Sequence, residues 1–170
     1  MQEEHLDIFD VNGNFLGVKT RSFCHRKSTK VFHKVVWVWI INSNKQILVQ
    51  KRSLKKKEFP GKWDMPVAGH KITGETCLKA CVREAQEELG LITKESDFKF
   101  LKEYVNKKGL ELAQVYILKN DTKIENMVLQ KGEVDEVKWL YYDEFVKYLY
   151  SDEFCNQDIE YKDWVCKILK

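Results

Sequence analysis

One amphipathic segment, Thr76 to Leu89, constrains the fold of this 170-residue chain more than any other feature. Glycines bracket it at Gly74 and Gly90, and Thr73 or Thr76 is suited to cap its start. At about 100° per residue, its apolar side chains fill one contiguous arc. These side chains are Leu78, Cys81, Val82, Ala85 and Leu89. The pattern predicts a long amphipathic helix over residues 76–89.

The segments around this helix are typical of strands. Val35–Ile41 is apolar on both faces, which predicts a buried central strand. Leu6–Val11 and Phe15–Thr20 flank a turn at 12–14 and predict a hairpin. Further strands are expected at 46–51, 98–105, 112–118 and 136–141, and closing helices at 142–150 and 158–169. Together these elements predict an α+β sandwich with a mixed sheet. We expect a single domain over 1–170, with residues 1–30 as an N-terminal hairpin extension.

The net charge of +3 conceals an uneven distribution. Residues 21–34 and 51–57 each carry five basic side chains and no acidic one, so the remainder of the chain is acidic. Two short basic segments favour a local anionic partner over a nucleic acid, which usually meets a broader positive surface; two solvated lysine-rich loops are the alternative. The first residues lack the pattern of a signal peptide, and no apolar run is long enough to span a membrane. Five cysteines without a CxxC pair favour reduced thiols, so we expect a cytoplasmic protein.

The polar arc of the predicted helix carries a cluster of carboxylates. Glu84, Glu87 and Glu88 stand at i, i+3 and i+4, so they share one face. Like charges at this spacing destabilise a helix unless a cation offsets them, and a divalent ion does so better than Lys79 or Arg83. A solvated acidic face is the alternative interpretation.

The run GHKITGETCLKACVREAQEELGL, from Gly69 to Leu91, matches the Nudix box at its fixed positions without a gap. The chain therefore resembles the Nudix superfamily, whose fold is an α/β/α sandwich with a loop–helix–loop that holds Mg²⁺ or Mn²⁺. The resemblance implies that Glu75 and Arg83 brace the motif through an ion pair. It also implies a metal site formed by Gly69, Glu84, Glu87 and Glu88. The implied reaction is hydrolysis of a small-molecule diphosphate by water attack on phosphorus. The general base is left open between a box glutamate and the later candidates Glu111, Glu133 and Glu136.

The flanking stretches HKVVWVWIIN and VQKRSLKKKEFPGKWD are similar to isopentenyl-diphosphate isomerases and their Nudix hydrolase relatives. In the isomerases, histidines and glutamates form a second metal site. Here His25, His33 and His70 stand at comparable places, Glu111 matches one glutamate, and Gly109 replaces the other. Structural or exposed histidines are the alternative.

One position separates the two activities. The isomerases have a catalytic cysteine directly before the box glycine, where this chain has Ala68. An alanine methyl group transfers no proton, so hydrolysis is favoured and isomerisation is the alternative. A binding module without turnover is disfavoured by the intact glutamates.

The basic loop after the central strands completes the expected site. Arg52 and Lys56 match positions that grip the diphosphate in the isomerases, and Arg–Lys pairs suit phosphate oxygens. We include Trp63 and His70 among the substrate-binding candidates, with core packing as the alternative for the tryptophan. We expect Glu84, Glu87, Glu88 and Glu111 to be catalytic. A homodimer through the N-terminal hairpin is possible on this sequence.

Overall fold

The computed structural model describes residues 3–26 and 28–170. Lys27, which belongs to the basic segment 21–34, lies outside the described part. The strands are β1 (His5–Phe9), β2 (Phe15–Thr20), β3 (Phe32–Ile41), β4 (Ile47–Arg52), β5 (Trp63–Asp64), β6 (Val67–His70), β7 (Phe98–Asn106), β8 (Glu111–Lys119) and β9 (Val134–Leu140). The helices are α1 (Arg21–Cys24), α2 (Cys77–Leu89), α3 (Tyr142–Tyr150) and α4 (Ile159–Leu169), with 3-10 turns η1 (Glu95–Asp97) and η2 (Ile124–Asn126). None of the described helices is both long and apolar enough to span a membrane.

Strand β3 is the centre of the sheet, as its apolar sequence predicts. It runs parallel to β8 from His33 to Ile41, and its other edge pairs in turn with β1, β6 and β4. Strand β4 then pairs with β5 and β9, and β7 pairs with β8. The mixed sheet confirms the predicted fold class.

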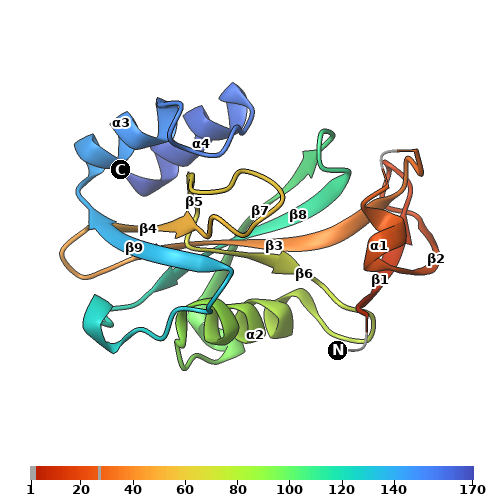
Figure 1. Ribbon diagram of the computed structural model, residues 1–170, viewed down its shortest axis with the longest axis horizontal. Coiled ribbons are helices and arrows are strands. Elements are labelled where there is room, and N and C mark those ends of the chain that lie inside the picture. The colour runs from red at the N-terminus through yellow and green to blue at the C-terminus, as the bar shows by residue number, and fades with distance from the viewer. Residues whose placement is uncertain (1–2, 27) are drawn as a thin grey trace.

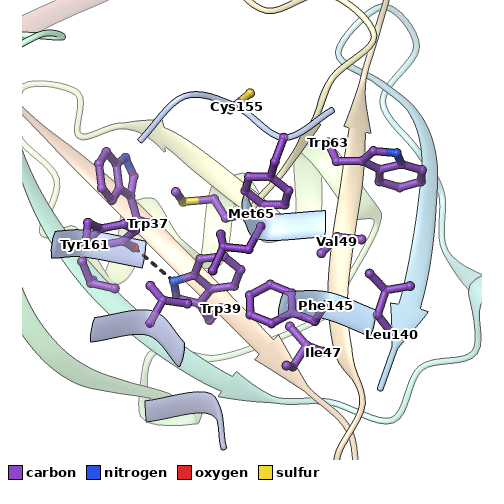
Figure 2. Close-up of a cluster of buried hydrophobic side chains, with 14 of the residues drawn as sticks. Trp37, Trp39, Ile47, Val49, Trp63, Met65, Leu140, Phe145, Cys155 and Tyr161 are labelled. Carbon is purple, nitrogen blue, oxygen red and sulfur yellow. Dashed lines mark hydrogen bonds between the residues drawn. The ribbon is translucent and has the colours of Figure 1, made fainter. Parts of the chain in front are cut away.

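Two cores flank the sheet, because alternate side chains of β3 point to opposite faces. Helices α3 and α4 cover one face and α2 covers the other (Figure 1). Figure 2 shows the first core, where the Trp39 indole donates a 3.1 Å hydrogen bond to the Tyr161 hydroxyl beside Phe145. On the opposite face, Val36 and Val38 pack against Cys81 and the rest of the apolar arc of α2. The result is an α/β/α sandwich.

Helix α2 begins and ends where its sequence predicts. The Thr76 hydroxyl accepts a 3.1 Å hydrogen bond from the Lys79 amide, which makes Thr76 rather than Thr73 the N-cap. At the other end Gly90 adopts a left-handed conformation (φ 67°), and its amide donates to the Gln86 carbonyl. The helix therefore ends at Leu89, directly before the predicted glycine.

The N-terminal hairpin is joined to the sheet and to the loop before α2. Strand β1 pairs with β3 at Ile8 and Phe9, and Asp7 accepts hydrogen bonds from Lys71 (2.6 Å) and Thr73 (2.9 Å). The sequence did not predict the single turn α1 that follows β2, because four residues are too few to show a helical period. The hairpin extension is thus part of the domain's packing.

Candidate active site

Helix α2 presents its three glutamates differently. Glu84 and Glu88 are buried against the sheet, with 9% and 7% of their surfaces exposed, whereas the side chain of Glu87 is 48% exposed. The helix lies across β6, so the two inner carboxylates reach the edge of the strand that ends at His70. The predicted carboxylate face is therefore a partly buried site.

Gly69 is needed at its position for space. Its φ is not in the left-handed region, but a Cβ there would overlap the Glu84 carboxylate. The absence of a side chain on β6 lets α2 approach closely enough for Glu84 to lie over the strand. The structure thus brings Gly69 and Glu84, two of the predicted metal-binding positions, into direct contact.

Arg83 connects the loop before α2 to the glutamates. Its guanidinium contacts Glu75 at 2.7 Å, as the resemblance implies, and also Glu84 at 2.7 Å and Glu87 at 3.3 Å. It donates in addition to the carbonyl of His70 at 2.8 Å. One arginine therefore fixes the loop, the helix and the end of β6 together, and it offsets the repulsion among the carboxylates.

Glu88 lacks such support. Its Oε2 accepts only long hydrogen bonds of 3.4 Å, from the Gln50 side chain and from the Ala68 amide. Among the described residues, no lysine or arginine lies within ion-pair distance of it. Burial, followed by the neighbouring Glu84, raises the pKa of Glu88 well above its ordinary value. A buried carboxylate without a cationic partner is costly, so this residue is suited to a bound cation.

Three histidines far apart in the sequence meet beside the box. Ligand atoms of His25, His33 and His70 all lie within 4.8 Å of one another, and Nε2 of His25 is 3.0 Å from Nε2 of His70. His33 is fully buried, and neither of its ring nitrogens has a hydrogen-bond partner among residues 3–26 and 28–170. Burial lowers the pKa of His33 to about 3, so its ring is neutral at physiological pH. Neutral imidazoles with free nitrogen lone pairs are ligands for a transition metal.

Glu111 lies at the start of β8, in register with His33 on the parallel neighbour β3. Its carboxylate accepts a 2.8 Å hydrogen bond from Asn106. Burial raises the pKa of Glu111, and the hydrogen bond from Asn106 and the nearby His70 oppose that effect. The structure therefore places Glu111 with the histidines, on the face of the sheet to which Val35 and Trp37 of β3 also point.

The other two candidates for the general base form ion pairs with lysines. Glu133 pairs with Lys56, and Glu136 lies 4.0 Å from Lys51 and 3.3 Å from Lys138. The Glu133 charge still helps to raise the pKa of Glu88, so Glu133 is near the box. Glu136 is half exposed on β9.

The two predicted phosphate-binding residues lie four positions apart, at the end of β4 and in the loop that follows it. Arg52 ends β4 and contacts Asp64 at 3.3 Å, with its side chain 18% exposed. Lys56 follows in the loop to β5 and pairs with Glu133. Their partners Asp64 and Glu133 both help to raise the pKa of Glu88, so the two cations lie near that carboxylate.

The structure places Trp63 in the core instead of in an open site. Only 4% of its surface is exposed, and Figure 2 shows its ring among the side chains of the first core. The ring packs edge-on against Tyr148, and the Lys138 ammonium lies over it. A ring covered in this way has no free face for a substrate, so we do not include Trp63 in the proposed site. The polar groups of the loop, rather than its tryptophan, remain available.

No cysteine replaces the missing thiol at position 68. Ala68 lies on β6, opposite Trp37 of β3, and donates its amide to Glu88. Cys77 and Cys81 pack with the apolar side of α2, and all five cysteines are free. The position that would carry proton transfer in an isomerase therefore holds a methyl group.

Sequence reasoning did not single out two buried polar residues. Gln50 and Asp64 face each other across β4 and β5, with 3% and 7% of their surfaces exposed. A polar side chain within an otherwise apolar strand, as in ILVQ and WDM, is the signal that would have identified them.

Comparison with known proteins agrees with this geometry. The NUDIX domain family profile matches residues 31–162. The chain is 37% identical over 157 residues to Nudix hydrolase 3 of Arabidopsis thaliana. The matched stretch covers 85% of this chain but only 20% of the Arabidopsis protein. It is 30% identical to the uncharacterized Nudix hydrolase lmo0368 of Listeria monocytogenes, covering 83% and 82% of the two chains. The isopentenyl-diphosphate Delta-isomerase of Citrobacter koseri matches 54% of this chain and 50% of its own length at 36% identity.

The fold has a solved counterpart along its whole length. The crystal structure of DR0079 from Deinococcus radiodurans superposes with a TM-score of 0.75, covering 98% of this chain and 97% of that one at 21% identity. This likeness shows the fold, and the family follows from the domain match and from the relatives above. The chain belongs to the Nudix hydrolase family.

Proposed function

We propose that this protein hydrolyses the diphosphate bond of a small organic diphosphate, most simply a nucleoside diphosphate derivative, with Mg²⁺ or Mn²⁺. The observation that carries the proposal is the Glu88 carboxylate, buried beside Glu84 with no cationic partner in the described part of the chain. Carboxylate oxygens with water and substrate phosphate are the usual ligands of Mg²⁺. The basic end of β4 beside the same cluster supports a phosphate partner.

The residues of the chain divide the work. Glu84, Glu87, Glu88 and the Gly69 carbonyl would hold the metal, which when bound activates water and stabilises charge on the phosphate oxygens. Arg83 keeps two of these carboxylates in place while bracing the loop through Glu75. Arg52 and Lys56 would bind the diphosphate, and a box glutamate or Glu111 would accept the proton of the attacking water.

The test is hydrolysis of a panel of nucleoside diphosphate derivatives and isoprenoid diphosphates, with Mg²⁺ titrated from zero. We expect Glu87→Gln and Glu88→Gln each to lower kcat by at least about 100-fold. Activity that survives both substitutions would refute the proposal. Deuterium exchange into isopentenyl diphosphate tests the alternative isomerase, for which Ala68 predicts no exchange.

The histidine cluster is a second candidate metal centre. The observation that favours it is His33, buried with both ring nitrogens unpartnered next to two further imidazoles. We expect purified protein to contain a first-row transition metal in roughly stoichiometric amount by elemental analysis, and His33→Ala to lose it. Glu136→Gln, on the exposed part of β9, is the control. Equal metal content in wild type and His33→Ala would count against the centre.

A further inference from the structure

We infer that Asp64 is a positioning residue for the substrate diphosphate, because it holds the Arg52 guanidinium in a fixed orientation. The inference rests on the proposed function and adds to it a residue outside the box and outside the basic loop. Asp64 itself contacts no substrate in this scheme.

The contacts of Arg52 leave a defined set of donors free. Its Nε and Nη2 donate to the Glu58 carbonyl at 3.2 and 3.1 Å, and its Nη1 donates to Asp64 Oδ2 at 3.3 Å. A guanidinium has five N–H groups. Three are therefore used by the residues that the structure describes, and one on each terminal nitrogen has no partner among them. Two such donors in one plane match two oxygens of a phosphate.

Asp64 is itself held firmly. Its carboxylate is 10% exposed, and its second oxygen accepts a 2.9 Å hydrogen bond from the Met65 amide. Strand β5, which carries it, is clamped on its other side by the Trp63–Phe154 bridge and by the hydrogen bond from the Cys155 amide to the Trp63 carbonyl. A carboxylate with this little freedom fixes the arginine rather than following it.

The Asp64–Arg52 pair also adjoins the metal-binding carboxylates. Asp64 is opposite Gln50 in the β4–β5 register, and the Gln50 amide reaches Glu88 at 3.4 Å. One side chain thus separates the pair from a proposed metal ligand. A diphosphate bound at the metal extends into the reach of the Arg52 fork.

The inference is tested by the affinity of methylenediphosphonate, a non-hydrolysable diphosphate, measured by calorimetry with Mg²⁺ present. We expect Asp64→Asn to weaken binding about tenfold, and Arg52→Lys, which retains charge but loses the planar fork, to weaken it equally. The double variant should bind no more than about twofold less tightly than either single one, because both changes remove the same fork. In turnover assays Asp64→Asn should raise KM about tenfold and change kcat less than about threefold.

Asp135→Asn is the matched control. Asp135 is exposed and accepts a 3.1 Å hydrogen bond from the Leu54 amide, so it anchors the same loop without contacting Arg52. Its affinity should stay within about twofold of wild type. If Asp64→Asn fails to fold, Asp64→Glu keeps the charge and shifts the carboxylate by one methylene group, and it should also weaken binding.

Three results with the variants would overturn the inference. They are wild-type affinity in the folded Asp64 variant, equal weakening by Asp135→Asn, and multiplication of the Asp64 and Arg52 effects to about 100-fold. A wild-type protein that binds methylenediphosphonate but hydrolyses no diphosphate would refute the proposed function alone. Absence of binding by the wild type would refute the positioning role.

Discussion

Single side chains at the site trade stability for chemistry. Gly69 provides room that only a residue without a side chain can provide, and Glu88 keeps a carboxylate where an amide would be less costly. Both features make sense if a cation completes the cluster. Each of them leads to a test at one position.

Gly69→Ala should inactivate the enzyme while leaving it folded. The new methyl group must displace the Glu84 carboxylate, and a shift of about 1 Å in a catalytic group costs roughly 100-fold in rate. Steady-state kinetics and far-UV circular dichroism measure the two effects. A variant with near-wild-type kcat would show that Glu84 does not need this close approach.

Glu88→Gln should stabilise the protein in the absence of divalent cations. Replacing a buried, unpaired carboxylate with an amide of the same shape removes a desolvation cost of roughly 1–3 kcal/mol at pH 8. Urea unfolding in EDTA measures the gain. The same variant should lose the increase in Tm that Mg²⁺ gives the wild type. Lower stability than wild type in EDTA would contradict this account.

At the scale of elements, α2 depends on its first turn. Thr76→Ala removes the acceptor for the Lys79 amide and should lower the free energy of unfolding by about 1 kcal/mol. Thr76→Ser, which retains the hydroxyl, should restore most of it. Denaturant titration of the three proteins decides the matter, and equal losses in both variants would point to the lost methyl group instead.

The helices and strands differ in whether a sequence pattern is sufficient to predict them. The period of α2 and the apolar run in β3 are local signals, so both elements are predictable from the sequence. The two-residue strand β5 and the single turn α1 are too short to have a period, and only their neighbours make them regular. Asp64, a buried residue of β5, was missed for that reason.

At the scale of the whole molecule, Asp7 couples the N-terminal hairpin to the box loop, and the coupling depends on pH. Burial alone would raise the pKa of Asp7, but the hydrogen bonds from Lys71 and Thr73 outweigh it and lower the pKa. A carboxyl whose pKa is lower in the folded state stabilises the fold above its ordinary value of 3.8, and the benefit is lost as pH falls through the lowered value. Asp7→Asn should therefore destabilise the protein by about 1–2 kcal/mol at pH 7.

The difference between wild type and Asp7→Asn should begin to shrink as the pH falls below 3.8 and should vanish below the lowered pKa of Asp7. Unfolding curves from pH 7 to about pH 2 measure it, with Asp135→Asn as a control for an exposed carboxylate. A difference that is independent of pH would mean that packing, and not the charge, connects the hairpin to the domain.

The sequence by itself determined the spacing of the box. The shared face of Glu84, Glu87 and Glu88 follows from local geometry, because a helix places residues at i, i+3 and i+4 on one side whatever surrounds it. Only the tertiary structure decided that Glu84 lies over Gly69 and that Glu88 has no cationic partner among the described residues, since both depend on how α2 lies over β6. It also decided that His25, His33 and His70 meet and that Trp63 is buried. Such contacts join residues far apart in the chain. The register of β3 with β6 places His70 near His33, and His25 joins them from the end of α1, outside the sheet.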